Sequence, residues 1–154
     1  MRLIFILVLC FLSCSNNDDN DGPFFWALDN TKDIKSLSSY YKVYASLKYS
    51  NSKVEIWVDE KQAYKFSAEL SKSYGDEFAN NIHSKVSNIY GGESDVDKNG
   101  KVKILFLDIK DSFSGGGFIG GYFFQGDLFY DNGNGINITG GGQIHSNNGE
   151  IFYI

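Results

Sequence analysis

Two stretches in the first half of the chain alternate apolar and polar residues, over positions 41–49 and 54–58. Neighbouring side chains of a β-strand point to opposite faces, so this alternation predicts two half-buried strands. The sequence between them, Ser50-Asn51-Ser52, is typical of a turn. The two strands are therefore predicted to form a β-hairpin.

The apolar residues then take the spacing of an α-helix. Asp59, with Gln62 three residues later, predicts an N-terminal cap, and Gly91-Gly92 predicts the end of the helix. Gly75-Asp76 predicts a kink or a second N-cap within this long segment. The apolar positions fall into two sets: Ala63, Phe66, Leu70 and Tyr74, then Phe78, Ile82, Val86 and Ile89.

The second half of the chain has fewer regular patterns. The segment 102–109 is almost entirely apolar, which predicts a strand buried on both faces, and 150–154 predicts a last strand. The sequence ends within the apolar run 151–154. This end indicates either a domain interrupted in its middle or a terminal edge strand. The pattern as a whole predicts an α+β fold, with a mixed sheet of about four strands and a long backing helix.

The N-terminus has the pattern of an export signal. Met1-Arg2 precedes an apolar run over 3–12, which in a helix would reach only about half of a ~30 Å hydrocarbon core. Phe11-Leu12-Ser13-Cys14 resembles a bacterial lipobox, which implies a lipoprotein signal peptide over 1–13 and lipid attachment at Cys14. The alternatives are an ordinary secretory signal or a buried N-terminal strand.

The stretch that follows is polar and acidic, which predicts a lipid-anchored tether over 14–23 and a folded domain over 24–154. The lipobox implies a protein exported and anchored to a bacterial membrane, at the outer membrane or the cell surface. The net charge is −5, and the single arginine is Arg2. Without a basic stripe to bind phosphates, nucleic acid is not an expected partner.

The loop beginning at Asp95 carries a candidate metal site. Asp95, Asp97 and Asn99, followed by Gly100, have the order of the first half of an EF-hand calcium loop. The twelfth position, where such a loop has a bidentate Glu, is Phe106. Two interpretations remain: a weak calcium site closed by another segment, or a turn rich in Asp and Asn.

No complete catalytic site is present in the sequence. A zincin requires H-E-x-x-H on a helix, and the two histidines, His83 and His145, are far apart in the chain. The cysteines, Cys10 and Cys14, both lie in the N-terminal segment. The residues alone therefore predict neither a zinc ligand set nor a catalytic residue.

The order of the motifs nevertheless resembles the hyicolysin-like zinc metallopeptidases, the M30 family of zincins. The resembling stretch runs from about Val54 to Ile154. Its parts are Val54-Glu-Ile-Trp-Val-Asp-Glu60, Ile89-Tyr90-Gly91, the 95–105 segment with Asp108-Ile109, Gly121-Tyr-Phe, Gly126-Asp-Leu128, Ser146-Asn147 and Glu150-Ile-Phe-Tyr-Ile154.

This resemblance implies an incomplete zincin-like domain without its C-terminal metal-binding helix. A zinc ion would be bound only if that missing half were present. Ile151, Phe152 and Tyr153 would then form an edge strand beside a peptide substrate. The resemblance therefore implies a truncated or remnant surface lipoprotein that is inactive in peptide hydrolysis on its own.

A second function belongs to a different class: a non-catalytic surface lipoprotein that binds a peptide or a glycan. Aromatic residues among glycines can stack on sugars or peptides. The competing interpretation is that alternate members of this set fill the core. The residues are Phe113, Phe118, Tyr122, Phe123, Phe124, Phe129 and Tyr130.

Overall fold

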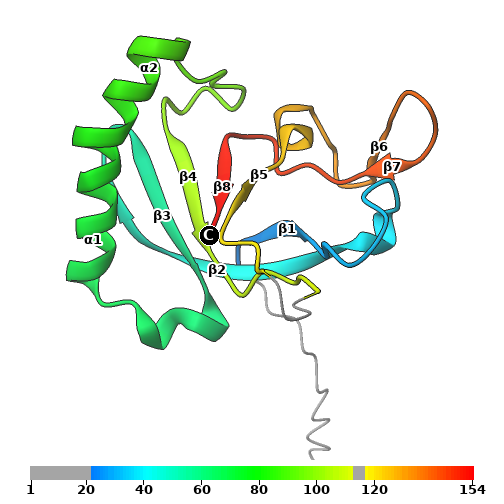
Figure 1. The fold of residues 1–154 in the computed structure, drawn as a ribbon, viewed down its shortest axis with the longest axis horizontal. Helices are drawn as coiled ribbons and strands as arrows, with labels where there is room; N and C mark the ends of the chain where they lie inside the picture. Colours follow the sequence, from blue (N-terminus) through cyan, green and yellow to red (C-terminus); the bar gives the residue numbers. More distant parts are fainter. Residues whose placement is uncertain (1–21, 113–116) are drawn as a thin grey trace, which may run out of the picture.

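The computed structural model describes residues 22–112 and 117–154, which form an α+β structure around a curled mixed sheet (Figure 1). The predicted N-terminal signal and Cys14 lie outside the described residues. The strands are β1 (Phe24–Leu28), β2 (Tyr40–Ser50), β3 (Val54–Asp59), β4 (Val102–Phe106), β5 (Tyr122–Phe123), β6 (Ile136–Asn137), β7 (Gln143–Ile144) and β8 (Ile151–Tyr153). The helices are α1 (Ala68–Glu77), α2 (Ser84–Tyr90), the π-helix η3 (Phe78–His83) and the 3₁₀-helices η1 (Leu37–Ser39), η2 (Glu60–Lys65) and η4 (Gln125–Leu128).

Six strands form one sheet in the order β1-β2-β3-β4-β8-β5, and β6 pairs with β7 separately. The predicted hairpin is present, because β2 pairs antiparallel with β3. The pairs β3–β4 and β4–β8 are parallel, whereas β5 runs antiparallel to β8. The prediction of about four strands was too low. Two strands of this sheet, β1 and β5, are missing from the prediction. Residues 24–28 are not among the predicted strands, and β5 is only two residues long.

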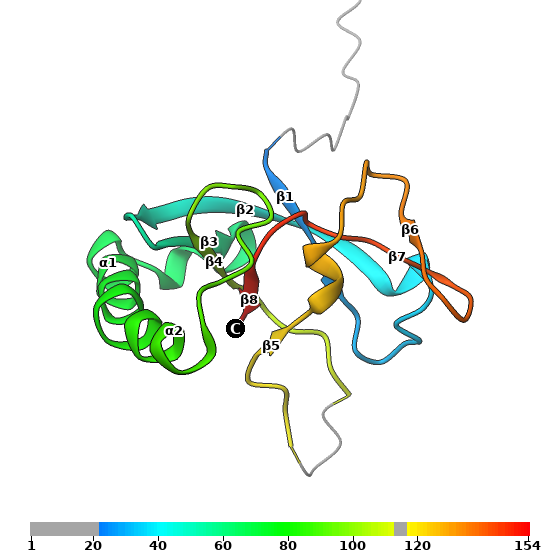
Figure 2. The same ribbon diagram turned by 90° about the horizontal axis from the view of Figure 1, so that it is seen from above.

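The helical segment packs against one face of the sheet (Figure 2). On this face Val54, Ile56, Val58 and Ile104 are buried, with Phe66 and Phe78 from the helical segment against them. The opposite face has its own apolar cluster, which includes Phe25, Val43, Leu105, Ile151 and Tyr153. Strand β4 contributes to both clusters, which confirms that it is buried on both faces.

The helical segment differs from the prediction at two places. Asp59 caps the segment as predicted, since its carboxylate accepts the Lys61 N–H at 3.0 Å, but a 3₁₀-helix follows and α1 begins only after Ser67. Gly75 lies inside α1 and makes no kink. The irregular stretch is the π-helix η3, and the segment ends at Gly91, whose φ of +88° confirms the predicted stop.

Gly75 is required by packing rather than by backbone freedom. A Cβ atom at this position would lie 2.3 Å from Cδ1 of Tyr49, a distance that real Cβ atoms do not reach. The Tyr49 hydroxyl donates to Asp76 at 2.6 Å, which holds the ring against α1. The glycine therefore allows β2 and α1 to approach closely.

Candidate functional site

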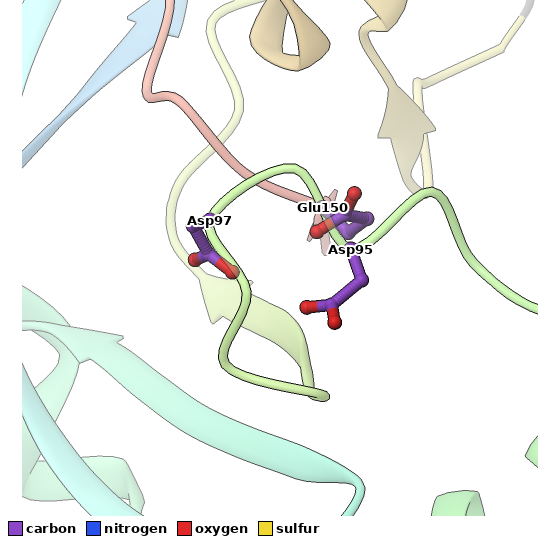
Figure 3. Close-up of side chains that lie close together, drawn as sticks. All are labelled: Asp95, Asp97 and Glu150. Atoms are coloured by element: carbon purple, nitrogen blue, oxygen red, sulfur yellow. The ribbon is translucent and has the colours of Figure 1, made fainter.

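The calcium-loop residues only partly come together as predicted. Asp95 and Asp97 lie in one group with Glu150, with one carboxylate oxygen from each within 4.8 Å of the others (Figure 3). Asn99 lies beside this group. Its side-chain oxygen accepts the Lys101 N–H at 2.7 Å, and its amide nitrogen donates to Asp97 at 2.7 Å. The third carboxylate of the group thus comes from Glu150, 55 positions after the first, and sequence spacing within the loop could not identify it.

Glu150 is buried, with 5% of its surface exposed. Its Oε1 accepts the Val96 N–H at 3.0 Å, whereas Oε2 is buried without a hydrogen-bond partner. Asp95 accepts the Gly100 N–H at 2.8 Å, and Asp97 forms an ion pair with Lys103. Three carboxylates are therefore faced by one ammonium group, which leaves the group with an excess of negative charge.

A second polar cluster, centred on Asp127, was not identified from the sequence. Asp127 lies in η4 and is 1% exposed. Its carboxylate accepts the Tyr153 hydroxyl at 2.6 Å and two N–H groups of Asn147 at 2.8 Å each. Asn147 also bonds the backbone N–H and carbonyl of Trp26 in β1. This cluster joins β1, β8 and η4, which are far apart in the sequence.

Burial raises the pKa of Asp127 to about 6, although the hydrogen bonds from Tyr153 and Asn147 act in the opposite direction. Burial also raises the pKa of the Tyr153 hydroxyl well above its usual value. A carboxyl group that titrates near neutral pH can act as an acid or a base. Among the described residues, the linings of the hollows beside the helical segment and beside Ile144 do not include Asp127, and its hydrogen bonds to Tyr153 and Asn147 favour a structural role.

The two histidines occupy separate surroundings. The His145 ring stacks on Trp26 with centroids 3.9 Å apart, and its Nδ1 lies 3.0 Å from Asp131. The His83 ring lies 2.9 Å from a Glu93 oxygen. Within residues 22–112 and 117–154, the three-carboxylate group is the one set of three or more His, Cys, Asp or Glu side chains whose ligand atoms lie close enough to share a metal ion. The described residues therefore do not fit a zincin zinc site, which needs histidine ligands brought together on a helix.

The segment Ile151, Phe152 and Tyr153 is not an edge strand. β8 lies between β4 and β5, and β5 pairs with it through Tyr122–Tyr153 and Phe123–Phe152. The short β5 is separated from the other strands in sequence by glycine-rich loops, so its pairing partner could not be predicted. A role of β8 beside a substrate stays a prediction.

An apolar groove runs between the helical segment and the end of the sheet. Two adjoining hollows of about 550 and 500 Å³ share Phe78, Ile82, Phe123 and Phe152 in their linings. Ile82, Val86 and Ile89 belong to the predicted apolar face of the helix, yet they are 44%, 49% and 72% exposed. An apolar surface of this extent is typical of a binding or interaction site.

The aromatic residues of the second half divide between core and surface. Tyr122 and Phe124 pack on the core, which agrees with the alternation expected of core filling. Phe118, Phe129 and Tyr130 are exposed at 76%, 59% and 83%, and Phe123 borders the groove. Phe113 lies outside the described residues. No helix in the described ranges is long and apolar enough to cross a membrane.

The comparison with curated proteins places the chain among relatives of the metalloproteases. The stretch of similarity covers 83% of the chain, and no family model matches. One relative is the neutral metalloprotease ShpI of Staphylococcus hyicus, a hyicolysin of the M30 family, which is 36% identical over 138 residues. The resemblance to the hyicolysin-like metallopeptidases is thus confirmed. The chain spans 28% of the length of this relative.

Proposed function

We propose that this chain is a surface lipoprotein that supplies a zincin-like scaffold of a metallopeptidase but does not hydrolyse peptide bonds by itself. The observation that carries the proposal is the 36% identity to a metalloprotease in a chain whose described residues offer no histidine ligand set for zinc. A zinc ion, when bound in such peptidases, activates a water molecule and polarises the substrate carbonyl. The residues of this chain would contribute the sheet, the backing helix and the apolar groove.

The apolar groove supports this proposal. A helix that presents an apolar stripe normally buries it against a neighbouring element. Ile82 and Val86 line the groove together with Phe123 and Phe152 of the sheet, and Ile89 on the same helical segment is 72% exposed. We propose that an apolar helix, of the kind that carries the metal ligands in zincins, would cover this groove and complete the core.

A peptidase assay tests the proposed inactivity. The purified chain is incubated with a quenched fluorescent peptide and with unfolded casein in the presence of Zn²⁺. We expect no hydrolysis above the level of a buffer control. Cleavage that co-purifies with the chain and is abolished by 1,10-phenanthroline would overturn the proposal. An unrelated zinc metallopeptidase in the same buffer shows that the assay conditions permit activity.

A second cysteine in the chain provides a matched control for a test of the proposed lipid anchor. Cys14 is the proposed acylation site, and Cys10 is a second cysteine four residues earlier. We expect Cys14→Ala to abolish palmitate incorporation and to move the protein into the aqueous phase in detergent partitioning, and Cys10→Ala to change neither. Equal labelling of the two variants would contradict an anchor at Cys14. Protease treatment of intact cells then tests the proposed outer-membrane or cell-surface location.

The second candidate function is the binding of a peptide or a glycan without catalysis. The exposure of Phe118, Phe129 and Tyr130 favours it, because exposed rings can stack on such ligands. Binding of a peptide or glycan array probe that is lost in Tyr130→Ala would support this function. Equal binding by the unaltered chain and by Tyr130→Ala, Phe129→Ala and Phe118→Ala would argue against it.

A further inference from the structure

We propose that Asp95, Asp97 and Glu150 form a Ca²⁺ site that links the loop before β4 to the residue preceding β8. The site is independent of zinc binding and of the proposed peptidase relationship. Its ligands are carboxylate oxygens from two segments that are distant in sequence, and Figure 3 shows the three side chains gathered around one gap. Such hard oxygen ligands suit Ca²⁺ rather than Zn²⁺.

The buried Glu150 side chain is the main evidence for a bound cation. Its Oε2 is buried and has no hydrogen-bond partner, while the rest of the carboxylate is fixed by the Val96 N–H. Burying a carboxylate oxygen without a partner is costly, and such groups in folded proteins are normally paired or coordinate a metal. A cation between Glu150, Asp95 and Asp97 would supply the missing partner.

The loop supplies the first part of an EF-hand arrangement, and Glu150 stands in for the missing twelfth residue. Asp95 and Asp97 occupy the first and third positions, and Gly100 occupies the sixth with a φ of +66°. An EF-hand closes with a Glu at position twelve, whereas this chain has Phe106 there. In the three-dimensional structure the closing carboxylate comes from the segment before β8.

Lys103 is the charged group that competes with a cation at this position. Its ammonium pairs with Asp97, and its side chain is 14% exposed. One positive charge opposite three carboxylates leaves a net charge of about −2, which a divalent cation would neutralise. We therefore expect Ca²⁺ to displace the Lys103 ammonium from Asp97, and removal of that ammonium to strengthen binding.

Calorimetric titration of the full chain with CaCl₂ tests the proposal directly. We expect one site with a Kd of roughly 10⁻⁴–10⁻³ M, the range of extracellular calcium modules, and weaker binding of MgCl₂. Glu150→Gln and Asp97→Asn should each weaken binding by about tenfold or more, since each removes a charged ligand. Lys103→Met should tighten it. Glu69→Gln, a carboxylate-to-amide change on the exposed side of α1, should leave the affinity unchanged.

Thermal unfolding in the same series separates a loss of binding from a loss of folding. Asp97 lies in an exposed loop, so Asp97→Asn serves if the buried Glu150→Gln fails to fold. Ca²⁺ should raise the unfolding temperature of the unaltered chain and of Glu69→Gln, but not of the two ligand variants. No binding by the folded, unaltered chain would overturn the site. So would binding that persists in both ligand variants, or Mg²⁺ binding as tight as that of Ca²⁺.

Discussion

The substitution Asp127→Asn tests whether the buried carboxyl group controls the stability of the fold. Asparagine keeps the shape of the side chain and removes its charge. Asp127 is 1% exposed and holds Tyr153 and Asn147, so the charge cannot be relieved by water. At neutral pH the buried charge lowers the stability of the folded wild-type protein, and the variant lacks this charge.

The size of this destabilisation follows from the pKa of Asp127. Burial raises the pKa of Asp127 from its ordinary value of 3.8 to about 6. A difference of roughly two pKa units corresponds to about 3 kcal/mol at 1.36 kcal/mol per unit. Because the folded state binds this proton more tightly than the unfolded state, its contribution to stability is complete below about pH 4. It is lost as the pH rises to about 6 and stays lost above that value.

Urea unfolding, followed by tryptophan fluorescence, measures the free energy of unfolding at each pH from about 4 to 8. The informative quantity is the difference between Asp127→Asn and wild type, because other groups titrate equally in both proteins. The amide also changes the hydrogen bonds at position 127, but this effect is the same at every pH. It adds a constant to the difference in the free energy of unfolding. We expect the difference to shift in favour of the variant by about 2–3 kcal/mol between pH 4 and 7.

The exposed Asp33 provides the control. Asp33→Asn changes the net charge by the same amount, and the exposed Asp33 carboxylate accepts the N–H of Lys35, in the same loop, at 3.0 Å. Its difference from wild type, measured over the same pH range, gives the effect of removing one exposed carboxylate. The reasoning about burial is refuted if the Asp127→Asn difference changes with pH no more than that of Asp33→Asn, or if the variant loses stability relative to wild type as the pH rises.

Three further substitutions test the packing and polar contacts. Gly75→Ala should destabilise the protein by about 1–3 kcal/mol through overpacking against Tyr49, which outweighs the ~1 kcal/mol gained in helix propensity. A variant that is more stable than wild type in urea unfolding would contradict the close contact. Ser67→Ala should cost about 1 kcal/mol, because the Ser67 hydroxyl oxygen accepts the Leu70 N–H at the start of α1; unchanged helix content and unfolding midpoint would rule out this cap. Asn147→Ala should lower the free energy of unfolding by roughly 3 kcal/mol or more, since it leaves the Trp26 backbone groups and the Asp127 carboxylate without this partner. A loss below about 1 kcal/mol in the same assay would show that water replaces the amide.

Local sequence patterns predicted the elements that depend on neighbouring residues. The alternation over 41–49 and 54–58 gave the β2–β3 hairpin, and Gly91 gave the end of the helical segment. The same logic failed at Gly75, because its small size serves a contact with Tyr49, 26 positions earlier. The pattern could not predict β5 either, since a two-residue strand has too few residues to show a period.

The candidate calcium site shows the same limit. The order Asp95, Asp97, Asn99 and Gly100 indicated a loop able to gather oxygen ligands, and two of these residues do lie in the group. Sequence spacing also named Asn99, whose amide nitrogen donates to Asp97 and whose oxygen accepts the Lys101 N–H. Glu150 joins the group because β4 and β8 pair in parallel, which brings the residue before β8 beside the loop before β4.

The sequence by itself determined the α+β class, the hairpin, the extent of the helical segment, and the relationship to the hyicolysin-like metallopeptidases. These features follow from residue spacing and from matching motifs in order. The tertiary structure decided the strand order, the inner position of β8, the Asp127 cluster and the third carboxylate near the loop. Each of these depends on contacts between segments far apart in the chain, and such contacts leave no periodic signal in the residues that make them.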